Sequence, residues 1–269
     1  MLERELDLAC SLAREAGRAV ETIRRSGFDA QLKADNSPVT EADLASDKIL
    51  RGGLKAAFPE DGLLSEESAD YRGRSGRTWI IDPLDGTRGF INDVEGYAVQ
   101  IGLVEAGEPV LGVVYEPRHD RLYYARRGIG AFLEESGARL PLQVSERARF
   151  AEMTLVASSS LSADLRREVS AALGFKESHA LRSVGTKVGM LVRGLAEAYL
   201  SHHSVSYWDS CGPMVILQEA GGTWTHLDLS PLLYDMSAPI PVHEGPFLVT
   251  NGVKHETICR AASRIINKA

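Results

Sequence analysis

The sequence Trp79-Ile80-Ile81-Asp82-Pro83-Leu84-Asp85-Gly86-Thr87 carries an apolar run that ends abruptly in two carboxylates three positions apart. The apolar residues predict a short buried strand, and Pro83, whose φ is fixed, predicts a turn directly after it. Such a turn would bring Asp82 and Asp85 to one side, and the glycine that follows would permit close backbone approach. If a helix begins near Thr87, its free amides would form an anion site beside the carboxylates.

Further acids lie outside this stretch. Glu66-Glu67 precedes it, and Asp209 follows an aromatic residue far downstream. Like-charged carboxylates that a fold brings together repel each other, so they either raise a pKa or hold a cation. Oxygen-only ligand sets suit Mg²⁺ rather than zinc. The pattern therefore predicts a magnesium-dependent phosphatase, although a bare Asp-Pro-x-Asp-Gly is also a common surface turn.

Composition argues against several classes of protein. The chain has 269 residues, enough for one large domain or two lobes, and a net charge of −7 with no basic run that would follow a nucleic-acid polymer. Its three cysteines are far apart and odd in number, which argues against a disulfide framework or a zinc site and predicts buried small side chains. The charged N-terminus is unlike a signal peptide, and no run approaches the ~18 apolar residues of a membrane span. We expect a cytoplasmic protein.

Periodicity in the first half predicts helices followed by strands. Apolar residues at helical spacing predict a helix over 2–25, and Thr40 is expected to cap a second helix that runs to about Phe58. Short buried strands are expected at 63–64 and 79–81. A meander of three strands is then expected over 97–104, 110–115 and 122–125.

Beyond about residue 150 the pattern alternates between strands and helices. The expected strands are 154–157, 198–200, 223–225 and 247–250. The expected helices are 163–173, 187–194, 210–220 and 254–266. We predict an α/β protein built from an α+β lobe over 1–150, with most of the acids, and an α/β lobe over 151–269.

Three segments resemble one family in their order and spacing. They are Ser65-Glu66-Glu67, Trp79 to Thr87, and Trp208-Asp209 with Glu219-Ala220-Gly221-Gly222. Together they resemble the lithium-sensitive, magnesium-dependent phosphomonoesterases, which include inositol monophosphatases, fructose-1,6-bisphosphatases and 3′(2′),5′-bisphosphate nucleotidases. The resemblance covers roughly residues 33 to 222. It implies a layered αβαβα sandwich of the sugar-phosphatase type, inhibition by Li⁺ and a homodimer.

The resemblance also implies two to three Mg²⁺ ions per active site. Glu66, Asp82 and the backbone carbonyl of Leu84 would bind one ion. Asp82, Asp85 and Asp209 would bind a second, and a third, looser ion would lie near Glu66. Two adjacent Mg²⁺ ions can bind both the attacking and the leaving oxygen of an in-line displacement, which agrees with this ligand set.

Catalysis and substrate binding are implied for other motif residues. Asp43 and Thr87 would orient and deprotonate the attacking water, and Gly86 with Thr87 would contact the phosphate. Ser183-Val184-Gly185-Thr186-Lys187 is similar to the part of the nucleotidases that reaches a second phosphate. No Ser-His-Asp spacing, P-loop or G-x-G-x-x-G is present, and phosphoryl transfer by positioned charge needs no protein nucleophile.

Each of these residues also has an ordinary structural explanation. Glu66 could be a solvated loop acid, and Asp209 could cap the helix that follows it. Asp43 lies where the first turn of a helix favours acids, and Thr87 could simply begin a helix. Lys187 could be an exposed residue at a helix start.

Two departures argue against a cyclitol substrate. Gly89 stands where inositol monophosphatases have the Asn of Asp-Gly-Thr-x-Asn-Phe. His202 stands seven residues before Asp209, where those enzymes place a sugar-binding Glu, and we expect it to be solvated or to face the substrate. In contrast, Lys33 to Asp43 and Leu64 to Glu67 look like bacterial 3′(2′),5′-bisphosphate nucleotidases.

The resulting prediction is hydrolysis of the 3′-phosphate of adenosine 3′,5′-bisphosphate to AMP and phosphate. An inositol-1-monophosphatase, or a phosphatase of another small sugar or alcohol phosphate, is the alternative. A more remote alternative is an inactive regulator that binds metal and phosphate. The expected partner is in each case a small phosphorylated metabolite, with no nucleic-acid polymer and no membrane.

Overall fold

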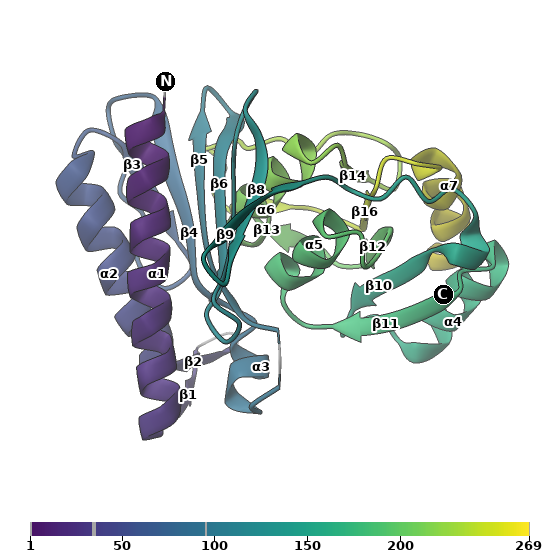
Figure 1. Ribbon diagram of the computed structural model, residues 1–269, viewed down its shortest axis with the longest axis horizontal. Coiled ribbons are helices and arrows are strands. Elements are labelled where there is room, and N and C mark those ends of the chain that lie inside the picture. The colour runs from purple at the N-terminus through teal and green to yellow at the C-terminus, as the bar shows by residue number, and fades with distance from the viewer. Residues whose placement is uncertain (1, 34–35, 95, 269) are drawn as a thin grey trace.

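The helices and sheets of the protein stack in five layers, α-β-α-β-α, in the computed structural model (Figure 1). The first layer is the helix pair α1 (Glu3–Ser26) and α2 (Glu41–Ala57), and the third is α5 (Val184–Val192) with α6 (Tyr207–Glu219). The last layer is α4 (Ala163–Leu173) with α7 (His255–Ile266). The structure describes residues 2–33, 36–94 and 96–268, so Ala34 and Asp35 of the nucleotidase-like segment lie outside the described residues. The predicted αβαβα sandwich is confirmed.

The first sheet has seven strands in chain order, and only its first two strands are parallel. They are β3 (Gly62–Ser65), β4 (Arg77–Asp85), β5 (Ala98–Glu105), β6 (Glu108–Glu116), β7 (Arg121–Arg126), β8 (Gly130–Glu135) and β9 (Ala138–Leu142). The meander was predicted, whereas the hairpin β8–β9 was not. Because β3 and β4 run in the same direction, the residues at their carboxyl ends, Glu66 and Asp82 to Asp85, lie at one edge of the sheet.

The second sheet has five strands in the order β11-β10-β12-β16-β14. They are β10 (Thr154–Ser158), β11 (Glu177–Leu181), β12 (Ala198–Ser201), β14 (Thr223–His226) and β16 (Phe247–Thr250). Strand β11, which is largely exposed, was not predicted. Helices α5 and α6 each begin three residues earlier than predicted, at Val184 and Tyr207.

Four short strands and two short helices complete the described structure. Strands β1 (Ala30–Leu32) and β2 (Pro38–Thr40) form a hairpin beside α2, and β13 (Val205–Ser206) pairs with β15 (Val242–His243). Helix α3 (Thr87–Ile91) follows β4, and a 3₁₀ helix, η1 (Phe150–Glu152), precedes β10. The predicted helix start at Thr87 is therefore present, but that helix has only five residues.

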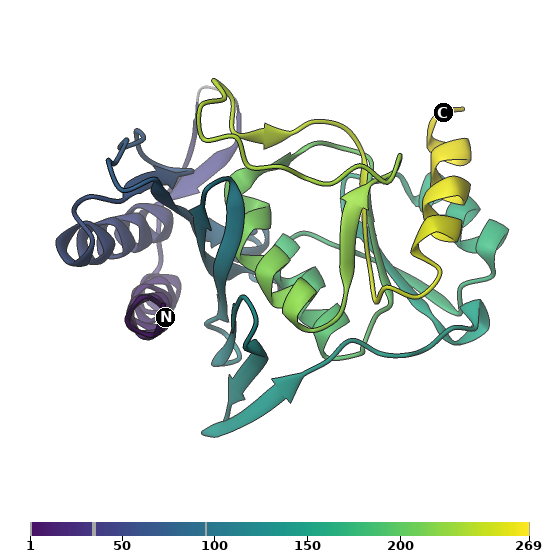
Figure 2. The same cartoon turned by 90° about the horizontal axis from the view of Figure 1, so that it is seen from above.

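Helix α6 lies against the first sheet (Figure 2), and glycines line the contact between them. A Cβ atom added to Gly112 on β6 would overlap the carbonyl oxygen of Gly212 on α6, and one added to Gly102 on β5 would overlap the sulfur of Cys211. Since only glycine lacks this atom, the backbones of the helix and the strands can approach closely. This approach places the first turn of α6, and with it Asp209, next to the end of β4.

The largest hydrophobic cluster extends through both halves of the chain. It includes Leu64 and Ile80 of the first sheet, Tyr199 and Phe247 of the second, and the apolar residues of α6 between them. The division into lobes near residue 150 therefore stays a prediction. Cys10, Cys211 and Cys259 are buried and unpaired, as predicted. Among the described helices, none has both the length and the apolar character of a membrane span.

Candidate active site

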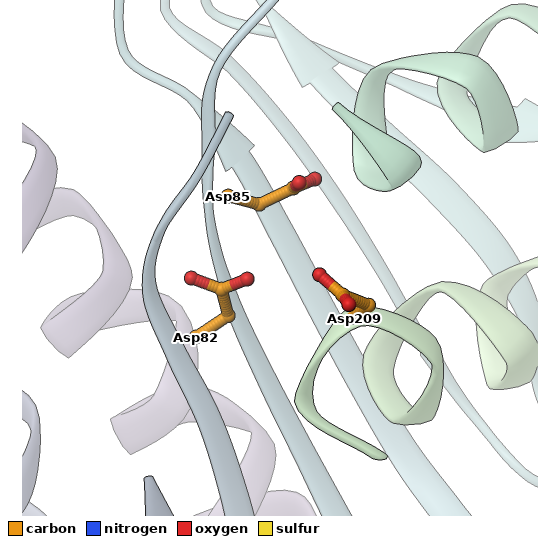
Figure 3. Close-up of side chains that lie close together, drawn as sticks. All are labelled: Asp82, Asp85 and Asp209. Carbon is orange, nitrogen blue, oxygen red and sulfur yellow. The ribbon is translucent and has the colours of Figure 1, made fainter. Parts of the chain in front are cut away.

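Three aspartates from distant parts of the chain meet between β4 and α6. Carboxylate oxygens of Asp82, Asp85 and Asp209 all lie within 4.8 Å of one another. Figure 3 shows the three side chains converging from the end of the strand and from the start of the helix. Asp82 and Asp85 are buried, and Asp209 is partly exposed. The structure thus brings together three of the acids that the sequence singled out as metal ligands.

The local backbone explains how Asp82 and Asp85 both reach this point. Strand β4 does not stop at a turn, as Pro83 had suggested, but continues to Asp85, and its pairing with β5 is irregular between Asp82 and Asp85. The prediction of a turn was therefore wrong, because the irregularity reorients the chain within the strand. Oδ1 of Asp82 accepts a hydrogen bond from the amide of Leu84 at 3.0 Å. Its Oδ2 is buried with no hydrogen-bond partner among the described residues.

Asp85 is held from the opposite side by the beginning of α5. Its carboxylate accepts hydrogen bonds from the Ser183 hydroxyl at 2.6 Å, the Gly185 amide at 2.8 Å and the Val184 amide at 3.2 Å. Free amides and positive partial charge at a helix N-terminus favour an anionic side chain there. The predicted substrate residue Gly185 therefore uses its amide on Asp85, whereas the hydroxyl of Thr186 is buried without a partner among the described residues.

The electrostatics of the three aspartates suit a cation. Burial, followed by repulsion from Glu66, Asp85 and Asp209, raises the pKa of Asp82 well above its usual value. Burial and the nearby Asp85 do the same to the pKa of Asp209, and burial also raises the pKa of Asp85. A bound Mg²⁺ would remove this repulsion and satisfy the unpaired oxygen of Asp82, so an oxygen-only set of this kind fits the ion that the sequence predicts.

Glu66 lies at the end of β3 but outside this group of three. Its Oε1 accepts from the ammonium of Lys33 at 2.9 Å, and the neighbouring Glu67 accepts from the same ammonium at 2.6 Å. Burial raises the pKa of Glu66, against the opposing effect of Lys33. The loop that carries Glu66 is fixed by the buried Asp47, which accepts hydrogen bonds from the hydroxyls of Ser65 and Ser68.

The two residues predicted to activate water are in contact. The hydroxyl of Thr87 lies 3.0 Å from Oδ1 of Asp43 and 3.1 Å from the carbonyl oxygen of Leu84. Asp43 occupies the first turn of α2, where its other oxygen accepts from the amide and the hydroxyl of Thr40 in a capping box. Burial raises the pKa of Asp43, against these hydrogen bonds. The catalytic role of the pair stays a prediction.

Lys187 is completely buried, so its interpretation as an exposed helix-start residue was wrong. Its ammonium donates to the carbonyl oxygens of Arg182 at 2.7 Å and Leu181 at 3.3 Å, and lies 4.6 Å from the centre of the Tyr199 ring. Burial lowers its pKa to about 8, while Asp85 and Asp209 act in the opposite direction. The role of Lys187 toward a substrate stays a prediction.

Other residues of the site were not predicted. Ser183, Asp47 and Lys33 hold the acids in place. Ser183 and Lys33 belong to the segments that resemble the nucleotidases, but these contacts were not predicted for either of them. His202, which was predicted to be solvated or to face the substrate, is partly buried. It packs against His203 with ring centres 3.6 Å apart, and its buried Nδ1 has no partner among the described residues. Whether it faces a substrate stays a prediction.

Known proteins share this sequence and this fold. A family model described as the inositol monophosphatase family matches residues 1–267. The histidinol-phosphatase of Chlorobaculum parvum is 36% identical over 232 residues, which are 81% of this chain and 84% of that protein. The 3′(2′),5′-bisphosphate nucleotidase CysQ of Escherichia coli K12 is 36% identical over 224 residues, 80% of this chain and 88% of that protein. The extragenic suppressor protein suhB of Bartonella henselae has a similar crystal structure, with a TM-score of 0.85 at 23% identity over 97% of this chain and 99% of that one.

Proposed function

The chain belongs to the inositol monophosphatase family of phosphoric monoester hydrolases, and on that premise we propose a substrate and a role for each residue of its site. The substrate that we propose is adenosine 3′,5′-bisphosphate, which would lose its 3′-phosphate to give AMP and phosphate. The observation that supports phosphatase chemistry most strongly is the convergence of Asp82, Asp85 and Asp209. Three carboxylates that are largely shielded from water and repel one another are suited to Mg²⁺ and a phosphate monoester.

The acids at the end of β4 and the start of α6 would hold the metal. Asp82, Asp85 and Asp209 supply carboxylate oxygens, and Glu66 and the carbonyl of Leu84 lie at the same edge of the sheet. Two to three Mg²⁺ ions in this position would neutralise the phosphate and lower the pKa of a bound water. The protein contributes fixed ligands: the hydrogen bonds from Ser183 and Gly185 hold Asp85 in one orientation.

Thr87 and Asp43 would act on the proton of the attacking water. The Thr87 hydroxyl donates to Asp43, which leaves the lone pairs of Thr87 Oγ1 free to accept a hydrogen bond from water. Asp43 is the acceptor at the end of this chain, and burial gives it a raised pKa, which makes it a stronger base than an exposed aspartate. Gly86 and the amide of Thr87 would face the phosphate.

Several features support a nucleoside bisphosphate. The segment Lys33 to Asp43 is similar to that of bacterial nucleotidases, and one such enzyme, CysQ, is 36% identical to this chain. Gly185, Thr186 and Lys187 at the start of α5 would lie toward the second phosphate, where the unpaired hydroxyl of Thr186 could donate. His202 replaces a carboxylate that would repel that phosphate.

Histidinol phosphate is the second candidate substrate. One observation favours it: the histidinol-phosphatase of Chlorobaculum parvum is as similar to this chain, at 36% identity, as CysQ is. Both substrates are monoesters and both would present their phosphate to the same acids. They differ in the leaving group, which is a nucleotide in one and a cationic amino alcohol in the other. That difference makes the two candidates separable by kinetics.

A substrate panel tests the proposal. Initial rates of phosphate release would be compared for adenosine 3′,5′-bisphosphate, histidinol phosphate, inositol 1-phosphate and fructose 1,6-bisphosphate, with Mg²⁺ present. We expect the highest kcat/KM for the nucleotide, and Asp82→Asn from the same purification should release none, which excludes a contaminating phosphatase. A clear preference for inositol 1-phosphate or histidinol phosphate would overturn the choice of substrate. Activity that survives excess chelator would overturn the metal mechanism.

Further properties of the enzyme are proposed from the same family membership. We propose inhibition by Li⁺, a homodimer, a cytoplasmic location and a boundary between two lobes near residue 150. Inhibition would be measured as phosphate release across a LiCl titration, with NaCl at equal ionic strength as the control. The oligomeric state would be measured by sedimentation.

A further inference from the structure

Lys33 makes direct ion pairs with the acids at the end of β3. Its ammonium lies 2.9 Å from Oε1 of Glu66 and 2.6 Å from Oε1 of Glu67. The side chain of Glu67 is only 4% exposed, and those of Lys33 and Glu66 are 22% and 24% exposed. Ion pairs that are this short and partly shielded from water are stronger than pairs on an open surface.

The position of Lys33 is set by the hairpin of β1 and β2. Its amide donates to the carbonyl of Ser37 at 2.8 Å, and its own carbonyl accepts from the amide of Asn36 at 3.0 Å. The hairpin is joined to α2 at Thr40, so its placement depends on the same helix that carries Asp43. Lys33 therefore reaches the acids from outside the sheet that bears them, on a small element that contacts the molecule mainly through α2 and α3.

Glu66 lies outside the group of three aspartates and pairs with Lys33 instead. The carboxylate oxygens of Asp82, Asp85 and Asp209 lie within 4.8 Å of one another, whereas Glu66 is engaged by an ammonium. Yet Glu66 is close enough to contribute the largest repulsion that Asp82 experiences from a neighbouring acid. A cation bound between Glu66 and Asp82 would be near Lys33 and would be repelled by it.

We propose that the Lys33 ammonium is an internal counter-ion that competes with Mg²⁺ for Glu66. In the metal-free protein it pairs with both Glu66 and Glu67 and offsets one of their two charges, and an ion that takes Glu66 as a ligand has to displace it. Lys33 thereby weakens the binding of that ion and keeps it exchangeable, with a smaller effect on an ion that is held by the three aspartates alone. This inference rests on the proposed magnesium-dependent function.

Calorimetric titration of the full-length, metal-free protein with MgCl₂ tests the proposal without any activity measurement. Lys33→Met removes the charge but keeps much of the side-chain length, so the Mg²⁺ that uses Glu66 should bind at least about threefold tighter. Lys33→Arg keeps the charge and should bind Mg²⁺ as the wild type does. The matched control is Lys176→Met, which removes one lysine charge from an exposed position in the other half of the chain.

The outcomes separate this inference from the proposed function. Equal or weaker Mg²⁺ binding by Lys33→Met, with the wild type binding normally, would overturn the role of Lys33 and leave the metal site intact. A wild-type protein that binds no Mg²⁺ would overturn both. An equal gain in Lys176→Met would show a general effect of net charge and would also overturn the inference. Circular dichroism of each variant identifies any loss of fold. If Lys33→Met does not fold, the Mg²⁺ affinity of Lys33→Arg is compared with that of the wild type.

Discussion

At the scale of single residues, Asp82 is under strong electrostatic repulsion from its neighbours. It is 1% exposed, and three other acids repel it. One of its oxygens has no hydrogen-bond partner in the part of the chain that the structure describes. Such an arrangement lowers the stability of the metal-free protein at neutral pH, because the folded state holds charges that the unfolded chain exposes to water. Metal binding therefore favours an aspartate at this position, whereas the stability of the metal-free protein favours an uncharged side chain.

Asp82→Asn should stabilise the metal-free protein and weaken metal binding. Removing one of the repelling charges should raise the free energy of unfolding of the metal-free protein by about 1 kcal/mol or more, which corresponds to roughly 2–4 °C in Tm. At the same time, Mg²⁺ should no longer raise Tm, because the ligand is lost. Thermal unfolding with and without MgCl₂ measures both effects. Asp7→Asn, the same change on the exposed side of α1, should alter neither, and an undiminished Mg²⁺ effect in Asp82→Asn would contradict the assignment.

The sequence could predict the convergence of the aspartates but not the burial of Lys187. Asp82 and Asp85 lie together because they are three residues apart at a strand end, and Asp209 follows from the family motif. Lys187 depends on where α5 begins. That helix starts at Val184, three residues before the predicted start, so Lys187 lies within the helix, on the face that also carries the buried Val184 and Leu191. The side chain therefore points into the protein, where carbonyl oxygens bind it.

At the scale of elements, the docking of α6 determines the position of Asp209. The helix contacts β5 and β6 through Gly102, Gly112 and Gly212, which lets the backbones approach closely. The apolar residues of α6 face both sheets, so its sequence has no amphipathic stripe and its ends were difficult to locate. The β8–β9 hairpin was not predicted because much of its surface is polar or exposed, so its sequence lacks a clear pattern of buried apolar residues.

Gly112→Ala should move the start of α6 and weaken metal binding. The added methyl group would overlap the carbonyl oxygen of Gly212, which belongs to a helix backbone and cannot rotate away. We expect a loss of about 1–3 kcal/mol in stability, the usual range for overpacking, and weaker Mg²⁺ binding in calorimetry. Gly52→Ala in α2 is the control, since a Cβ there meets no atom within 4 Å. Unchanged Mg²⁺ affinity in Gly112→Ala would show that Asp209 does not depend on this contact.

At the scale of the whole molecule, a buried histidine makes the free energy of unfolding depend on pH. His243 is 4% exposed, and its ring lies 4.6 Å from that of Tyr207 and 4.7 Å from that of Tyr234. Burial, with a smaller effect of His226, lowers its pKa from 6.5 to about 3. Between these two values the unfolded chain binds a proton that the folded protein does not. The free energy of unfolding should therefore fall as the pH falls below 6.5.

His243→Gln should flatten this pH dependence. Each buried neutral histidine contributes a slope of about 1.4 kcal/mol per pH unit within its window, and glutamine has no proton to gain. Urea unfolding of both proteins in EDTA, at pH about 7 and about 5, gives the difference between their slopes, in which the contributions of the carboxylates cancel. Wild type should lose more stability than the variant on acidification. Parallel pH profiles would mean that the pKa of His243 is the same in the folded and the unfolded state.

Both halves of the chain contribute residues to the candidate active site. Asp82 and Asp85 come from the first sheet, while Asp209 and the hydrogen-bond donors of α5 come from the second half. Local patterns predicted most of the individual elements. The pairing of the halves could not be derived from these patterns, because it depends on contacts between residues about a hundred positions apart, such as Asp85 with Ser183. Only the family resemblance anticipated it.

Strand β9 is the last strand of the first sheet, and its outer side has no pairing strand among the described residues. Open edges of this kind can recruit a strand from another molecule and extend into aggregates. Here Pro141 has no amide hydrogen to donate, and Arg139 places an exposed charge that stacks on the Phe132 ring at 4.0 Å. Both features oppose intermolecular strand addition. Replacing the proline and the arginine together would leave an uninterrupted edge strand for pairing with another molecule. In the native protein, these two residues therefore oppose fibrillar self-association.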